Sequence, residues 1–446
     1  MVKVETHTFP NGLRIVYEKS KSKLPITTIF LFCDLGSLYE KENFRGVSHF
    51  IEHMCFKGTQ RILKTRDIFK EFDKSGSVFN ASTFKQYTYY YIECLSEDLM
   101  IYFQILSDIL LNSTFIQKEY DKELKVVIEE NVKNEDNKEY ILSDAIDSLI
   151  YKGCPLENPI DTLAFHKTQG SYDRQKVLDL YELFYQPSNM VVSMVSNLSL
   201  STLLYKIKHT YFYSRKSFHV DALSREKLVI YQPPAVQTNI AYNIKEIPHT
   251  KATYLSIAFR TCSQHSLDKY VLNLLEYIIG GFYNSRLFML LREDNGLTYK
   301  TRVNNQYFEV MGDLTLMAIT DPKKLIKNHE KKGVLPLIIG LLKELIEKGV
   351  RKEELAMAKT FIKGRMILNM SDQETNAVYN GEEVLLYKKK DIIPYQKIYE
   401  TYYKHLTMHH MNQAIRHYFK KENMCVCLIG NIPCSHEMIQ RECEKL

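Results

Sequence analysis

The sequence predicts an α+β protein built from two homologous α/β sandwich domains in tandem. The first observation is its length, because 446 residues exceed the size at which one hydrophobic core usually stops growing. The second is a long-range repeat: NMVVSMVSNL from Asn189 and NMCVCLIGNI from Asn423 are both buried-strand patterns that end in asparagine before an apolar residue. The third is that strand patterns precede amphipathic helices in each half, which favours an α+β sandwich.

A second pair of similar segments supports the duplication. ITTIFLFCDLGS precedes a helix with HFIEHM in the first half, and TYLSIAFRTCS precedes a helix with NLLEYI in the second. Between the halves, Pro233, Pro234 and Pro248 lie in a stretch without clear periodicity. We therefore expect an N-terminal domain over residues 1–220, a linker over 221–249 and a C-terminal homologous domain over 250–446.

Local signals predict individual elements. Asn11-Gly12 lies between two alternating segments and predicts a β-hairpin with a type I′ turn at the N-terminus. The clearest helix is expected from Leu335 to Lys348, with leucines along one side and Gly349 as its stop signal.

Composition and charge exclude several classes of function. The net charge of +6 is interleaved along the chain, whereas a nucleic-acid-binding protein would show a concentrated basic stripe. No apolar run approaches the ~20 residues that span a membrane, and the N-terminal segment lacks a signal-peptide core. Nine scattered cysteines are typical of a reducing compartment. We therefore expect the cytosol, with a mature form in a mitochondrial-type matrix as the alternative.

The first half contains the pattern H-x-x-E-H within GVSHFIEHMCFKGT. On an α-helix, His49 and His53 are one turn apart on the same face, so their imidazoles can converge on one metal ion. Glu52 reaches the same space without being obliged to bind the metal, and it can take a proton from a water activated by zinc. The spacing predicts a zinc peptidase site, and its non-functional alternative is a set of polar side chains on a surface helix.

A third ligand is required, because catalytic zinc usually has three protein ligands and an open fourth position. The downstream segment ELKVVIEE places Glu123 and Glu130 two turns apart on one helix face. Glu130 is the predicted third ligand, and Glu123 is the predicted hydrogen-bond partner that orients a histidine. Glu129, about 100° further round the helix, is expected to face elsewhere.

These motifs together resemble the pitrilysin family of inverzincin zinc peptidases, over essentially the whole chain. HFIEHMCFKGT with the two downstream glutamates carries the resemblance, and TFPNGLRIVYE is similar to the opening hairpin of the family. The chain resembles the half-length members of this family, such as the catalytic subunit of the mitochondrial processing peptidase and its bacterial homologues. The resemblance implies a metalloendopeptidase with one Zn²⁺ per chain.

The resemblance also implies how a substrate is held. GSVFNASTFKQYTYY looks like the substrate-binding edge strand of the family, which assigns an extended peptide to Asn80, Ala81, Ser82 and Thr83. GGFYNSRLFMLLREDNGLTYK looks like the C-domain signature, which assigns Arg292 and Tyr299 to the substrate carbonyl that becomes an oxyanion.

Three positions depart from the patterns described above. Asn273 and Tyr277 stand where the first half has His49 and His53, so the second domain is not expected to bind zinc. In PLENPIDT, Asp161 stands where the family usually has glycine, and we expect an altered turn there.

The number of domains predicts a partner. Full-length members of the family enclose a chamber with four such domains, and this chain has two. We therefore expect a homodimer, or a heterodimer with a related chain, in which one chain supplies Arg292 and Tyr299 to the zinc of the other. Substrates would be peptides or unfolded polypeptides. The alternatives are a non-catalytic assembly subunit, like the respiratory core proteins, and a zinc-stabilised binding module.

Overall fold

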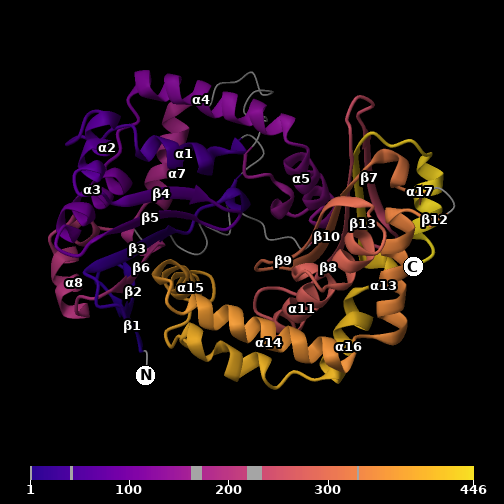
Figure 1. Cartoon of the computed structure of the whole chain (residues 1–446). Helices are drawn as coiled ribbons and strands as arrows, with labels where there is room; N and C mark the ends of the chain where they lie inside the picture. The colour runs from indigo at the N-terminus through magenta and orange to yellow at the C-terminus, as the bar shows by residue number, and fades with distance from the viewer. Residues whose placement is uncertain (1–2, 41–43, 162–172, 218–233, 329–330) are drawn as a thin grey trace. The chain divides into compact units, whose positions relative to one another are not determined.

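The computed structural model describes residues 3–40, 44–161, 173–217, 234–328 and 331–446 (Figure 1). The chain divides into two compact units, each built from three segments. The first unit comprises residues 1–132, 158–230 and 366–398, and the second comprises residues 133–157, 231–365 and 399–446. Much of the expected linker falls on residues 218–233, outside the described residues. The division into 1–220 and 250–446 stays a prediction.

The first unit is built on a six-stranded mixed sheet in the order β1-β2-β6-β3-β5-β4. Strands β2 and β6 run parallel, and the other neighbours run antiparallel. Strand β4 lies at one edge of this sheet. The central strands β3 and β6 are buried almost throughout, as their continuous apolar runs require. The strands are β1 (Val4–Thr8), β2 (Arg14–Lys19), β3 (Ile26–Cys33), β4 (Val78–Thr83), β5 (Thr88–Leu95) and β6 (Met190–Ser196).

Helices pack against both faces of this sheet. On one face, a large apolar core joins the sheet to α1 (Val47–Cys55), α2 (Thr65–Asp73), α3 (Leu99–Leu111), α4 (Gln117–Asp136), α7 (Arg174–Phe184) and α8 (Leu200–Lys208). On the other face, α15 (Gln373–Leu385) packs on β2, β3 and β6. Ala377 and Val384 of this helix share a second core with Phe30 and Phe32 of β3. The candidate site lies on α1 and α4.

The second unit has a five-stranded sheet in the order β7-β13-β8-β10-β9. Helix α5 (Lys138–Ile150) packs on β8 and β13, while α13 (Val334–Lys348) contacts α16 (Met408–Tyr418) and α17 (His436–Cys443). Helix α11 (Asp268–Glu276) contacts α16 and β9. The strands are β7 (Ala241–Glu246), β8 (Thr253–Thr261), β9 (Thr298–Tyr307), β10 (Gly312–Thr320) and β13 (Met424–Gly430).

The two sheets repeat one arrangement. Strands β2-β6-β3-β5-β4 and β7-β13-β8-β10-β9 have the same order along the chain, and in both the first pair is parallel and the others are antiparallel. Strands β6 and β13 are the two segments that begin after Asn189 and Asn423. The predicted α+β fold with two homologous halves is therefore confirmed.

Two local predictions have different outcomes. Helix α13 ends at Lys348 and is followed by Gly349 with a φ of 72°, as expected. The N-terminal hairpin forms, but the type I′ turn is wrong. Phe9 and Leu13 are joined by a hydrogen bond around the turn, and Gly12 has a φ of 87°, whereas Asn11 lies outside the positive-φ region. A type I′ turn would require both central residues there.

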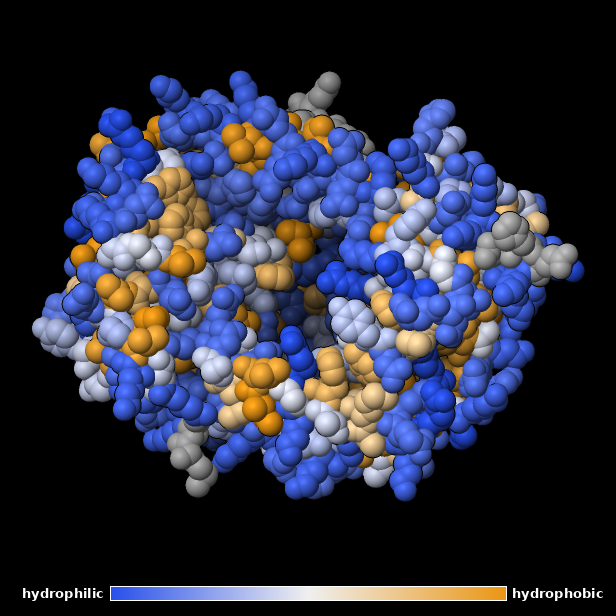
Figure 2. Space-filling view, in the orientation of Figure 1, coloured by the Kyte–Doolittle hydropathy of each residue, from blue (hydrophilic) through white to orange (hydrophobic). Residues whose placement is uncertain are grey.

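Three further features concern the surface, the apolarity of the helices and the cysteines. Hydrophilic side chains predominate on the face in Figure 2, with apolar ones in small groups. Across the described ranges, no helix combines the length and apolarity needed to cross a membrane. All nine cysteines are free thiols. Cytosolic location stays a prediction.

Candidate metal centre

Helix α1 separates an apolar side from a polar side at the spacing that the sequence predicted. The buried side faces the core of the first unit, and the other side carries His49 and His53. The core-facing residues are Val47, Phe50, Ile51 and Met54. Packing therefore fixes the rotation of the helix and directs both histidines away from the core.

The start of α1 is fixed by a buried carboxylate. Glu40 accepts hydrogen bonds from the backbone N–H groups of Gly46, at 2.6 Å, and Ser48, at 2.8 Å. These groups have no partners within the helix, so Glu40 satisfies them. Burial raises the pKa of Glu40 to about 7, although the two N–H groups oppose that rise.

The two histidines turn the same ring nitrogen toward each other. His49 Nε2 lies 3.1 Å from His53 Nε2. On the far side of each ring, Nδ1 faces a carboxylate. His53 Nδ1 is 2.9 Å from Glu123 Oε1, and His49 Nδ1 is 3.0 Å from Asp161 Oδ1. The two Nε2 atoms are therefore the ring nitrogens that can bind a metal ion.

Helix α4 brings Glu130 to the same point. Its Oε2 atom lies 3.7 Å from His53 Nε2, and the donor atoms of His49, His53 and Glu130 all lie within 4.8 Å of one another. Their side chains are 12%, 21% and 43% exposed, so the two histidines are enclosed while Glu130 remains reachable. Glu129 is exposed on α4, in keeping with its expected direction.

The surrounding charges favour a cation. Burial alone would lower the pKa of His49, but the Asp161 carboxylate beside it raises that pKa to about 9. Burial alone would raise the pKa of Glu123, but hydrogen bonds from His53 and Lys57 lower it. Lys57 Nζ lies 2.7 Å from Glu123 Oε2. Glu123, Glu130 and Asp161 thus surround the histidine pair with negative charge.

This donor set fits zinc. Two imidazole nitrogens and one carboxylate oxygen are typical of catalytic zinc, which keeps a fourth position for water or substrate. Zinc-binding histidines also usually hold a carboxylate or carbonyl on the other ring nitrogen, as both do here.

Glu52 lies beside the donor set and is held by strand β4. It is buried, and Thr83 Oγ1 donates a hydrogen bond of 2.6 Å to Glu52 Oε2. Burial raises the pKa of Glu52, while the Thr83 hydroxyl and the two histidines offset part of the rise. A carboxylate with a raised pKa is suited to take up and release a proton. Thr83, one of the expected substrate-binding residues, turns its side chain to Glu52, while its backbone belongs to the edge strand.

A pocket of about 300 Å³ adjoins His53. Three phenylalanine rings form its apolar part, and those of Phe69 and Phe79 stack with centroids 5.7 Å apart. Asn80 and Ala81 of the edge strand line the same pocket. The lining residues are Glu52, His53, Phe56, Lys57, Phe69, Phe79, Asn80, Ala81 and Glu123.

Arg292 and Tyr299 belong to the second unit, whereas the metal group belongs to the first. Arg292 Nη1 donates to the backbone carbonyls of Thr298, at 3.2 Å, and Tyr299, at 2.8 Å. The Tyr299 side chain is exposed at the start of β9. The structure therefore brings the predicted pair together and leaves the phenol ring accessible.

In the second unit, Asn273, which replaces the first histidine, is hydrogen-bonded to two tyrosines, and the ring of Tyr277, which replaces the second, packs on Phe361. Asn273 Nδ2 donates to the hydroxyl of Tyr403 at 2.9 Å, and Asn273 Oδ1 accepts from Tyr307 at 2.8 Å. Within the described residues, the His49, His53 and Glu130 group is the one set of donors arranged for a metal ion.

Comparisons with known proteins identify the family. The family model described as "Insulinase (Peptidase family M16)" matches residues 14–162, and the model described as "Peptidase M16 inactive domain" matches residues 171–361. An uncharacterized zinc protease of Rickettsia felis is 30% identical over 360 residues, which cover 80% of each chain. The chain belongs to peptidase family M16. This is the pitrilysin family that the motifs resembled.

Other similar proteins agree in length or in fold. The uncharacterized zinc protease YmxG of Bacillus subtilis is 29% identical over 399 residues, which cover 87% of this chain and 90% of YmxG. A protease from Helicobacter pylori has the same fold, with a TM-score of 0.85 at 20% identity, over 96% of this chain and all of that one. This M16 chain is therefore of the half-length type.

Three residues lie at the site although the sequence patterns did not predict a role for them there. The sequence predicts only an altered turn at Asp161, whereas its carboxylate lies 3.0 Å from His49 Nδ1. Lys57 stood inside the motif without a role, and it pairs with Glu123. Glu40 lies upstream of the motif, and no spacing rule connected it to the start of α1. The contacts of Asp161 and Glu40 depend on loop conformation, and that of Lys57 depends on the rotamer of a long side chain. Helical periodicity predicts neither.

Proposed function

We propose that this M16 chain is a zinc-dependent endopeptidase that binds one Zn²⁺ through His49, His53 and Glu130. The observation that carries the proposal is the convergence of their donor atoms within 4.8 Å, with a carboxylate behind each histidine. When bound there, zinc would polarise the scissile carbonyl and the attacking water. The relatives named zinc proteases support this assignment.

Glu52 is the proton carrier of the reaction. Its carboxylate accepts a proton from the attacking water and returns it to the amine nitrogen of the leaving peptide. The hydrogen bond from Thr83 holds one carboxylate oxygen in place. Burial raises the pKa of Glu52, which makes its acid form a usable donor in the second step.

The substrate is an extended peptide that adds to the open edge of the first sheet. Strand β4 is an edge strand, so the backbone of Asn80, Ala81, Ser82 and Thr83 can pair with a peptide by β-augmentation. The phenylalanine pocket next to His53 accommodates a bulky apolar side chain close to the bond that is cut. Peptides and unfolded segments meet both conditions.

The active form is a dimer, most simply a homodimer, that encloses a chamber. Arg292 and Tyr299 of one chain face the zinc of the other, where they steady the substrate and the oxyanion. The support is that the half-length chain has two homologous halves and that only the first has a metal donor set among its described residues.

The test is to incubate the zinc-loaded wild type and Glu52→Gln with a peptide library and identify the products by mass spectrometry. We expect the wild type to cleave, and Glu52→Gln to lose about 10²–10⁴-fold in turnover while it keeps its zinc. Wild-type activity in Glu52→Gln would contradict the role of Glu52. Zinc binding without any cleavage by the wild type would favour a non-catalytic assembly subunit.

A further inference from the structure

The two histidines of the proposed zinc site are held by carboxylates from different parts of the chain. Glu123, which faces His53 Nδ1, lies on α4 seven residues before the proposed ligand Glu130. Asp161, which faces His49 Nδ1, lies beyond the 3-10 helix Pro155–Glu157. The site therefore depends on a segment that carries none of the proposed zinc ligands.

We propose that Asp161 is a positioning residue that strengthens zinc binding through His49. Its carboxylate lies 3.0 Å from Nδ1 and its charge favours a proton on that nitrogen, which leaves the Nε2 lone pair for the metal and restrains the ring. Its negative charge also makes the imidazole a stronger donor. The inference rests on the zinc site proposed above and extends it to a residue outside the H-x-x-E-H and glutamate motifs.

The segment that carries Asp161 is anchored close to this carboxylate. The buried Lys85 donates from Nζ to the backbone carbonyl of Asn158 at 3.1 Å, and Ser37 Oγ approaches the same carbonyl at 3.5 Å. Asn158 is itself buried, and the Asp161 side chain is 17% exposed. A carboxylate fixed in this way can hold the ring of His49 at little further cost in conformational entropy.

The test measures zinc affinity by chelator competition in wild type, Asp161→Ala and Asp161→Asn. We expect Asp161→Ala to raise the Kd for zinc by about 10–100-fold. Asp161→Asn keeps an acceptor and loses the charge, so its Kd should lie between the other two. Glu157→Gln is the matched control, because Glu157 lies on the same segment and accepts the Gly153 N–H instead. Its Kd should equal that of the wild type.

Thermal unfolding of the metal-free proteins separates positioning from folding. If Asp161→Ala does not fold, Asp161→Asn decides, because it replaces one oxygen with a nitrogen of similar size. Folded variants that bind zinc within about twofold of the wild type would overturn the role of Asp161 and leave the proposed zinc site intact. A wild type that binds no zinc would overturn the proposed function, and this inference with it.

Discussion

At the scale of single residues, we expect selectivity among substrates to depend on the aromatic rings beside His53. Phe69 lines the pocket next to the metal group and is 37% exposed, so its truncation should spare the core. We expect Phe69→Ala to lower kcat/KM about tenfold for a peptide whose phenylalanine enters the pocket, because that ring loses apolar contact. The same peptide with alanine at that position should be cut at an unchanged rate.

Phe84→Ala provides the matched control for this prediction. Phe84 is 38% exposed, but its ring contacts Tyr87 and Tyr89 and does not line the pocket. The Phe84→Ala variant should keep the wild-type ratio of kcat/KM for the phenylalanine peptide to kcat/KM for the alanine peptide. Equal changes in both variants would remove the pocket from the account of selectivity.

Helical periodicity predicted which residues meet at the metal group, because it depends on local backbone geometry alone. His49 and His53 on α1, and Glu123 and Glu130 on α4, share faces at one-turn and two-turn spacings. Asp161 and Lys57 could not be placed in this way. Their contacts require the path of a loop or the rotamer of a long side chain, and neither leaves a periodic pattern.

At the scale of secondary-structure elements, the packing of α15 on the first sheet depends on one glycine. A Cβ atom at Gly381 would lie 2.1 Å from Cε2 of the buried Phe32. We expect Gly381→Ala to destabilise the protein by about 1–3 kcal/mol through overpacking, seen as a lower thermal midpoint.

Gly364→Ala is the control for Gly381→Ala. Gly364 lies inside α14 (Lys352–Asn369), and a Cβ atom there meets nothing within 4 Å. Alanine favours the helix, so this variant should gain up to about 1 kcal/mol. A midpoint that falls equally in both variants would show that close contact with Phe32 is not the cause.

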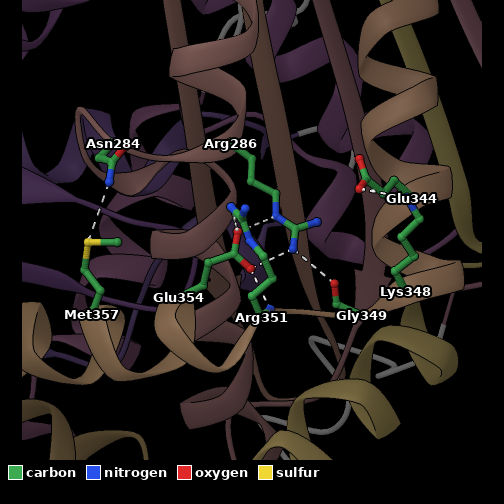
Figure 3. A network of polar contacts seen from close by, with 8 residues as sticks. All are labelled: Asn284, Arg286, Glu344, Lys348, Gly349, Arg351, Glu354 and Met357. Atoms are coloured by element: carbon green, nitrogen blue, oxygen red, sulfur yellow. Dashed lines mark hydrogen bonds and ion pairs between the residues drawn. The ribbon is translucent and has the colours of Figure 1, made fainter.

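The start of α14 is joined to α12 (Arg286–Phe288) by a network of charges (Figure 3). Arg286 donates to both carboxylate oxygens of Glu354, at 2.8 and 2.7 Å, and to the Gly349 carbonyl at 3.0 Å. Arg351 also donates to Glu354. Burial alone would raise the pKa of Glu354, but the two arginines lower it to about 2.

This network predicts acid sensitivity. Because the folded pKa of Glu354 is below its ordinary value of 4.5, its contribution to stability is complete above about pH 4.5 and falls as pH drops toward 2. Between pH 5 and 3, the thermal midpoint of the wild type should therefore fall more steeply than that of Glu354→Gln. Glu344→Gln, which removes an exposed i,i+4 pair with Lys348, should follow the wild type. Parallel curves for all three proteins would contradict the assignment.

At the scale of the whole molecule, the halves of the sequence exchange helices. Helix α5 precedes the second half in sequence but packs on β8 and β13, and α15 lies in the second half but packs on the first sheet. The repeated strands could be recognised from sequence because their apolar runs are alike. The exchange could not, since an amphipathic helix shows that one face is buried without showing which sheet buries it.

The proposed dimer predicts complementation between two inactive chains. Glu52→Gln lacks the proton carrier, and Arg292→Ala lacks the group proposed to act in the other chain. Each should be inactive alone. Mixed and allowed to exchange, they should regain activity, because the mixed dimer has one site with both residues intact. No recovery despite verified heterodimers would show that each site lies within one chain.

The central claim is that His49, His53 and Glu130 hold the metal, and zinc content per chain tests it most directly. The measurement is elemental analysis of the purified wild type, Glu130→Gln and Glu129→Gln after dialysis against trace zinc. Glu130 lies with the two histidines, whereas its neighbour Glu129 is exposed. We predict about one zinc per chain in the wild type and Glu129→Gln, and a sharp loss in Glu130→Gln, whose neutral amide is a weaker ligand than a carboxylate. Equal loss in both variants, or equal retention, would contradict the claim.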